Sequence, residues 1–313
     1  MKVRAILIRI GIYIPTVILA VFIIFMLQRL VPGDVASFIA GDNASPERLA
    51  AIREQLGLND PTVQQFLHWT GGAFTGDLGS SLLNGQSVTS LVMERLPITF
   101  QLTVMALIIA ALIGVPAGVI AARNRGRAMD TAMTTISSFG IAVPNFWLGM
   151  MLVVVFSLTL GWFPATGAVP FAVDPVESIR TLTLPAFALG LVGAAEISRQ
   201  VRGAMIENLE ADFIRTHRAK GLGEGAVVWR HALRNSSLPL LTVLGGQINR
   251  FLAGAVVVEM VFGVAGLGSL IVDATNQRDY PVVQGVVFVM AIIVLTTNLI
   301  VDFLYRVFDP RIA

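Results

Sequence analysis

Three polar side chains lie inside long apolar stretches of the sequence, where they could bind or guide a polar solute. Glu196 lies in the stretch 182–201, and Gln247 and Arg250 lie near the middle of the stretch 238–262. An ionisable group at the centre of a bilayer costs about 2.5–3.5 kcal/mol, so it normally pairs or lines a polar path. Residues three apart share a helical face, so Gln247 and Arg250 should point the same way.

Two interpretations of these polar side chains stay open. Glu196 can pair with Arg199 in its own helix, which needs no functional role. Alternatively, Arg250 can neutralise Glu196 across two helices, or it can meet the carboxylate of a transported solute. On the second interpretation, Glu196, Gln247 and Arg250 are candidate residues of a translocation pathway.

The sequence lacks the usual signatures of catalysis and of ATP binding. It has no Cys, no Gly-x-x-x-x-Gly-Lys-Ser/Thr phosphate loop and no His-Glu-x-x-His. His68, His217 and His231 all lie outside the apolar stretches. An intramembrane enzyme is therefore disfavoured, since its base would have to sit within the bilayer. We expect no catalytic residue, no metal ligand and no cofactor in this chain.

The composition indicates an all-α integral membrane protein. Only 13% of the 313 residues are charged and 55% are hydrophobic, whereas soluble domains carry about 25% charged residues. Basic residues are scattered, which argues against nucleic-acid binding. A bilayer is crossed by about 20 apolar residues in a helix. Six stretches meet this length, namely 8–30, 98–122, 133–160, 182–201, 238–262 and 282–305.

Basic residues in the connecting segments predict the orientation of these spans. They gather at the start of the chain, in the loops after the second and fourth spans, and in the tail, all of which fall on one side of a six-span protein. Both termini should therefore be cytoplasmic. The first stretch is too long for the apolar part of a signal peptide and lacks a small-residue cleavage site, so we expect a retained anchor.

The segment between the first two spans should face outward and contain short helices. Ser45 before Pro46 predicts a capped helix to about Leu56, ended by Gly57. A second helix is expected from Pro61 to about Thr70, where a series of glycines begins. The segment could be a surface cap, a lid or a docking surface.

The loop of about residues 204–237 carries the most distinctive pattern. Asp212 predicts the N-cap of a helix from Phe213 to Lys220, and Gly221 predicts its left-handed end. A second helix is expected from Glu224 to Arg234. A short capped helix between two spans could act as a rigid knob for a partner protein, or it could be only a basic cytoplasmic loop.

The motif Asp212–Leu222, followed by His231–Asn235 and Leu238–Pro239, resembles the coupling loop of ABC-importer permeases. The closest resemblance is to B-type subunits of the dipeptide/oligopeptide permease family. That family's general pattern opens with Glu-Ala-Ala where this chain has Arg215, Thr216 and His217, a departure typical of the peptide branch. Further matches cover almost the whole chain, at Leu30–Asp34, Gly76–Ser81, Glu94–Pro97, Pro144–Gly149, Gly254–Glu259, Phe262, Gly266–Gly268, Asp279–Gly285 and Asp309–Arg311.

The resemblance implies a type I ABC importer permease fold in the bacterial inner membrane. Residues 1–96 would form an anchor with an outer segment, and residues 97–307 the transmembrane domain. The chain would pair with a second, homologous permease, lie in membrane lipid, couple to two ATPase subunits that bind ATP and Mg, and receive solute from an extracytoplasmic binding protein. The residues implied in coupling are Asp212, Arg215, His217, Arg218, Ala219, Lys220, Gly221 and Leu222.

Import of short peptides is the function that the resemblance implies. Nickel, glutathione or an opine-type solute is the alternative within the same family. A stand-alone secondary transporter is the alternative of another class, and the coupling-loop motif argues against it. The spans alone do not distinguish these alternatives.

Overall fold

The computed structural model describes residues 3–30, 35–40, 45–55 and 57–308, and these residues are almost entirely helical. Outside the helices it contains one isolated antiparallel bridge between Ser80 and Ser87. Residues 31–34 and 309–311, which carry two of the sequence motifs, lie outside the described residues. The helices are α1 (Val3–Leu30), α2 (Val35–Ala40), α3 (Pro46–Gln55), α4 (Thr62–Thr75), α5 (Val88–Arg123), α6 (Ala128–Ala142), α7 (Asn145–Leu152), η1 (Val153–Thr159), α8 (Pro175–Glu210), α9 (Asp212–Ala219), α10 (Glu224–Ala226), η2 (Val227–Ala232), α11 (Leu233–Asn235), α12 (Ser237–Val261), α13 (Leu267–Asn276) and α14 (Tyr280–Phe308).

Four helices of the described chain are long and apolar enough to cross a bilayer. They correspond to the second, fourth, fifth and sixth predicted spans, at Val88–Arg123, Pro175–Glu210, Pro239–Val261 and Tyr280–Tyr305. The first predicted span lies in α1, where Ile14–Leu27 forms a shorter apolar stretch. The all-α membrane fold is thus confirmed.

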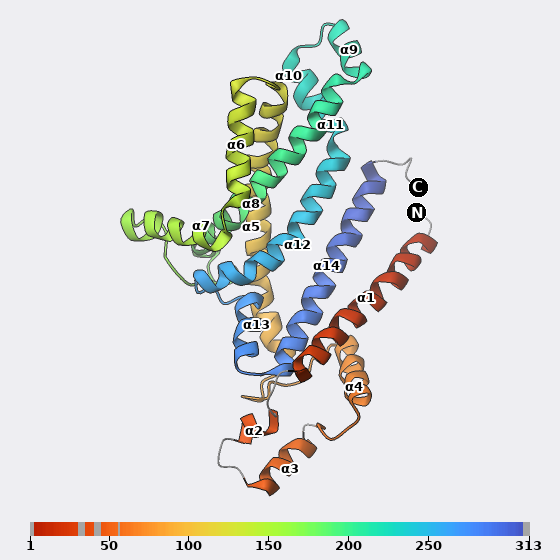
Figure 1. Cartoon of the computed structure of the whole chain (residues 1–313), viewed down its shortest axis with the longest axis vertical. Helices are drawn as coiled ribbons and strands as arrows, with labels where there is room; N and C mark the ends of the chain where they lie inside the picture. The colour runs from red at the N-terminus through yellow and green to blue at the C-terminus, as the bar shows by residue number, and fades with distance from the viewer. Residues whose placement is uncertain (1–2, 31–34, 41–44, 56, 309–313) are drawn as a thin grey trace. The chain divides into compact units, whose positions relative to one another are not determined.

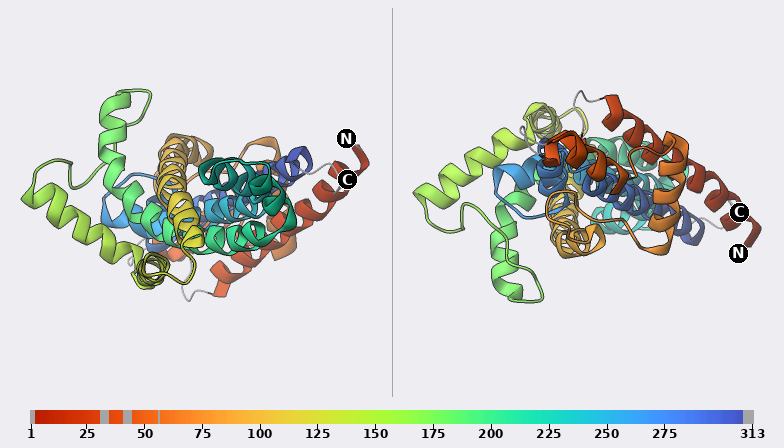
Figure 2. Two further views of the ribbon diagram at one scale, coloured as in Figure 1. Left: turned by 90° about the horizontal axis from the view of Figure 1, so that it is seen from above. Right: turned by 90° about the horizontal axis from the view of Figure 1, so that it is seen from below.

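The third predicted span is sharply bent. Residues Ala128–Ala142 and Asn145–Thr159 meet at an angle of 99°, so the predicted stretch from 133 to 160 is broken into two helices at Pro144. Pro144 has no N–H to donate, and Val143 before it is extended with ψ 124°, as a residue preceding proline prefers. Figure 1 shows α7 leaving the axis of α6, and in Figure 2 α6 is seen end-on while α7 runs across the view.

One compact unit combines residues 1–96 with 270–295. Helix α4 packs Phe66 against Phe22 and Phe25 of α1, and Trp69 and Phe74 against Phe288 of α14. These contacts stabilise α4 beyond its predicted end at Thr70, so that it passes through two glycines and ends at Thr75, before Gly76 with φ +93°.

The two predicted features of α3 are confirmed. The hydroxyl of Ser45 accepts a hydrogen bond from the backbone N–H of Arg48 at 3.3 Å, which is the expected N-cap. Gly57, just beyond the helix, has φ +63°. The described helix runs to Gln55, and the predicted end at Leu56 lies outside the described residues.

The second compact unit combines residues 97–269 with 296–313, and α8 is its central helix. Helices α6, α7 and α12 pack against α8, and α5 approaches it through glycine. A Cβ added to Gly114 would lie 2.6 Å from the carbonyl oxygen of Ala194, and one added to Gly118 would lie 2.5 Å from that of Ser198. This small-residue contact lets the two backbones meet closely.

Candidate functional site

The polar side chains of α8 and α12 form one cluster. Gln247 donates its side-chain N–H to Oε2 of Glu196 at 2.7 Å, and the guanidinium of Arg250 makes an ion pair with the same oxygen. Glu196 therefore pairs across the two helices rather than with Arg199, the local partner considered from the sequence. The structure brings together all three candidate pathway residues.

The cluster is buried on one side and open on the other. Gln247 is 2% exposed, whereas the side chains of Glu196 and Arg250 are 19% and 58% exposed. Arg250 is eleven residues from each end of the span Pro239–Val261, so it lies at the middle of that span. An Arg at this depth is expected to face a protein interior or a water-filled path.

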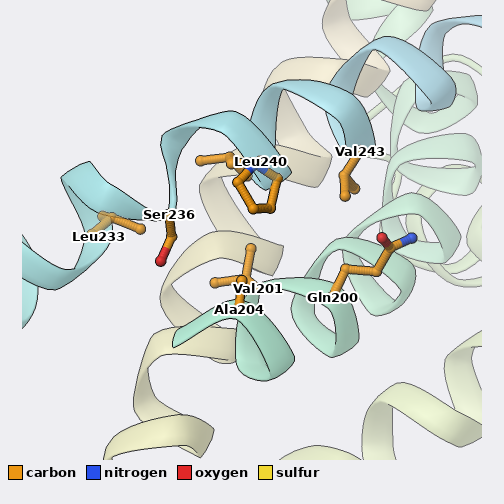
Figure 3. A pocket seen from close by; sticks show the side chains of 8 residues that line it. Gln200, Val201, Ala204, Leu233, Ser236, Leu240 and Val243 are labelled. Carbon is orange, nitrogen blue, oxygen red and sulfur yellow. The ribbon is translucent and has the colours of Figure 1, made fainter. Parts of the chain in front are cut away.

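A small cavity lies between α8 and the beginning of α12, lined mainly by apolar groups of Val201, Ala204, Leu240 and Val243. Figure 3 shows these side chains with the hydroxyl of Ser236 at one side. The volume is about 30 Å³, which suits one water molecule and excludes a transported solute. This cavity is therefore not itself a binding site for a peptide-sized solute.

The predicted short helix of this loop is present as α9, with one correction to its beginning. Asp212 is the first residue of the helix and makes no side-chain cap bond, because Ala211 occupies the N-cap position. Asp212 instead pairs with Arg215 one turn later at 3.6 Å. The predicted end is confirmed, since Gly221 has φ +77° and its N–H donates to the carbonyl of Arg218 at 2.9 Å.

Helix α9 is held in place by the second predicted helix of this loop. That helix exists as the continuous run α10, η2 and α11, whose middle turn Val227–Ala232 is π-helical. Ile214 of α9 is fully buried, and the ring of His217 stacks on that of His231 at 4.1 Å. Figure 1 shows α9, α10 and α11 together at one end of α8.

The charge of His231 in the histidine stack depends on its surroundings. The pKa of His231 is lowered below its ordinary value, mainly because the ring is partly buried. The positive charge of nearby His217, Arg230 and Arg234 lowers this pKa further. The uncharged ring is therefore the form that fits between these groups. The stack packs best when His231 is neutral.

The outer surface of α9 is basic and exposed. Arg215, Lys220 and Leu222 are exposed, as are Ala219 and Gly221. Arg218 is half-exposed and binds Glu224 through two N–H groups, at 2.7 and 3.3 Å, which lowers the pKa of the Glu224 carboxyl. The Arg218–Glu224 bridge closes the turn around Gly221, so Arg218 has an internal role that the sequence did not reveal.

Two further acidic side chains join helices through hydrogen bonds that the sequence did not reveal. Asp130 of α6 binds Arg202 of α8 through two hydrogen bonds of 2.6 and 2.8 Å. Glu259, fully buried in α12, accepts the hydroxyl of Thr99 at 2.7 Å and the N–H of Ser269 at 2.9 Å. A charged residue within an apolar stretch was the available signal for Glu259, but its partner Thr99 is 160 residues away in sequence.

The fold and these sites define an α-helical membrane protein whose polar groups meet inside its spans. The chain belongs to the family of binding-protein-dependent transport system inner membrane components, whose model matches residues 114–313. The N-terminal model of the same kind of component matches residues 2–103. It is therefore a multi-pass membrane permease subunit.

Curated relatives span the whole chain. A Brucella melitensis protein, named as a candidate peptide transport system permease, is 41% identical over 312 residues, covering 100% of this chain and 99% of its own length. The di/tripeptide transport system permease protein DppB of Pseudomonas aeruginosa is 38% identical, covering 97% of both chains. The oligopeptide transport system permease protein AppB of Bacillus subtilis is 39% identical, covering 96% of both.

A solved structure supports the fold. A chain of the inward-facing MetNI methionine ABC transporter aligns with a TM-score of 0.60 and 18% identity, covering 70% of this chain and 96% of that chain. The type I importer permease fold that the coupling-loop motif implied is thereby confirmed.

Proposed function

We propose that this chain is one permease half of an ATP-driven importer of di- or oligopeptides. The observation that supports the peptide substrate is the full-length similarity to the di/tripeptide and oligopeptide permeases. Peptides are polar and zwitterionic, and the open polar cluster of α8 and α12 supplies a polar group at mid-span for such a solute.

The loop of residues 204–237 is proposed as the coupling element. Its exposed basic helix α9 is rigidly held by the buried Ile214, the His217–His231 stack and the Arg218–Glu224 bridge. A rigid, short helix can transmit the movement of a partner ATPase to α8 and α12, which flank the loop. Asp212, Arg215, His217, Arg218, Ala219, Lys220, Gly221 and Leu222 are the proposed coupling residues.

The complete importer would contain a second, homologous permease, two ATPase subunits that bind ATP and Mg, and an extracytoplasmic binding protein. Residues 1–96 would serve as an anchor with an outer segment, and residues 97–307 as the transmembrane domain. Both termini would be cytoplasmic. Glu196, Gln247 and Arg250 would line this chain's share of the pathway.

Uptake in a deletion strain tests the function. Cells lacking the gene should fail to accumulate labelled di- and tripeptides, and the restored gene should recover uptake in the presence of the partner genes. Purified chain alone should hydrolyse no ATP. Recovery of nickel or glutathione uptake in place of peptide uptake would contradict the peptide assignment.

A further inference from the structure

One face of α12 is exposed from end to end of the helix, and its composition changes along the way. The exposed positions recur at helical spacing and therefore form one stripe. They are Thr242, Gly246, Arg250, Ala253, Val257 and Met260. The half that includes Arg250 has small or polar side chains, and the other half is apolar.

This stripe differs from the exposed stripe of α5 in the same chain. The exposed stripe of α5 carries large apolar side chains, among them Phe100, Val104, Ile108 and Leu112. Such a surface suits acyl chains, whereas a guanidinium at the middle of a span does not. The part of the α12 stripe around Arg250 is therefore better suited to a polar space than to acyl chains.

The guanidinium of Arg250 is held in place with donors to spare. Glu196 is its ion-pair partner among the described residues, and the contact uses one terminal nitrogen. A guanidinium has five N–H donors in a planar fork, so others remain free for a second carboxylate. The buried Gln247 holds the Glu196 oxygen independently of Arg250, which keeps Glu196 bonded if Arg250 turns toward a solute.

Charge balance indicates which solute group fits this site. The Glu196–Arg250 pair is neutral as a whole, and a zwitterionic peptide is neutral as well. A neutral solute entering beside a neutral pair leaves no unbalanced charge at mid-span. The planar guanidinium can bind a carboxylate through two parallel N–H bonds.

We propose that Arg250 binds the free C-terminal carboxylate of a peptide in transit, with Glu196 as the counterion that holds Arg250 in the empty state. This inference rests on the proposed peptide import. It makes Arg250 a solute-binding residue, and it makes Glu196 and Gln247 positioning residues.

Exchange of the two charges distinguishes this role from a structural ion pair. We would measure dipeptide uptake, together with the amount of chain in the membrane and its recovery with partner subunits, for Arg250→Gln, Glu196→Gln and the double variant R250E/E196R. We expect Arg250→Gln to lower uptake at least tenfold. The double variant restores an ion pair between α8 and α12, so it should assemble normally while uptake stays at least tenfold low, because an acidic side chain at position 250 repels a carboxylate.

A matched variant keeps the test decisive if the double exchange fails to assemble. Arg250→Lys retains the positive charge but loses the planar fork, so uptake should exceed that of Arg250→Gln severalfold and remain below wild type. Near wild-type uptake by the double variant, or equal uptake by the Lys and Gln variants, would overturn the inference. Absence of peptide uptake with the unaltered chain would instead overturn the proposed function.

Discussion

Gly221 ends α9 with φ +77°, and a Cβ added there would meet no atom within 4 Å. Backbone conformation rather than space therefore restricts this position to glycine. Gly221→Val should displace α9, at a cost of roughly 1–2 kcal/mol for a left-handed residue with a Cβ. We expect normal insertion into the membrane, because the spans are unchanged, but reduced uptake and reduced co-purification of ATPase subunits.

Gly223 offers a matched control two residues further on. Its Cβ would also meet open space, but its φ is −63° and its ψ is 144°, which valine adopts readily. Gly223→Val should therefore retain uptake. If Gly221→Val and Gly223→Val behave alike, the left-handed turn has no role in coupling.

The stack of His217 on His231 predicts pH dependence of the coupling element. The pKa of His231 is lowered in the fold, so folding favours the neutral ring. The stabilisation is complete above the ordinary pKa of about 6.5 and is lost as pH falls through the lower folded value. Hydrogen exchange of residues 212–220, corrected for intrinsic rates, should be faster at about pH 5.5 than at about pH 7.5.

The His231→Gln variant provides the control for this experiment. Glutamine cannot be protonated in this range, so the pH difference in exchange should shrink even if the variant is less stable at every pH. The positive charges of Arg230 and Arg234 are present in both the wild-type protein and the variant, so they do not account for a difference between the two. An unchanged pH difference in the variant would assign the effect to another group.

At the scale of helices, the contact between α5 and α8 depends on two small residues. A leucine at position 118 would place its Cβ 2.5 Å from the carbonyl oxygen of Ser198 and 2.8 Å from the Cβ of Val201, and both distances are too short for atoms that are not bonded. Gly118→Leu should destabilise the chain by about 1–3 kcal/mol or more through overpacking. The measurement is the thermal unfolding midpoint of the purified protein in detergent.

Gly203 of α8, the helix that Gly118 of α5 contacts, provides the comparison, since a Cβ there meets nothing within 4 Å and the residue is exposed. Gly203→Leu changes helix propensity in the same direction but adds no clash. The unfolding midpoint should fall for position 118 and stay level or rise for position 203. Equal midpoints would show that α5 and α8 do not pack as described.

Local signals in the sequence predicted most helices but not their tertiary partners. Apolar length identified the four helices that are long enough to cross a bilayer, and Ser45 and Gly221 identified helix ends. The 99° angle, by contrast, depends on packing of α7 against α8 and α12. The length of α4 depends on aromatic contacts with α1 and α14. The Gln247 partner of Glu196 lies 51 residues away in sequence, and the Thr99 partner of Glu259 lies 160 residues away. Such contacts leave no local pattern.

For the whole molecule, the distribution of basic residues predicts one orientation in the membrane. The loop that contains α9 and the loop containing Arg123, Arg125 and Arg127 should be cytoplasmic, and the segment with α3 and α4 should be outside. This orientation is required by the coupling proposal, because ATPase subunits act in the cytoplasm. An inverted chain would place α9 on the side where the binding protein delivers solute.

Single cysteines can test this orientation directly, because the chain has no native Cys. Asn59 lies in the turn before α4 and Gly223 in the loop after α9, and both are exposed. The experiment uses intact cells whose outer membrane has been made permeable. A maleimide that cannot cross the inner membrane should label Asn59→Cys and leave Gly223→Cys unlabelled. After cell lysis both should react, which controls for accessibility of the thiol. Labelling of position 223 in intact cells would place α9 outside and would contradict the orientation and, with it, the assignment of α9 as the ATPase contact.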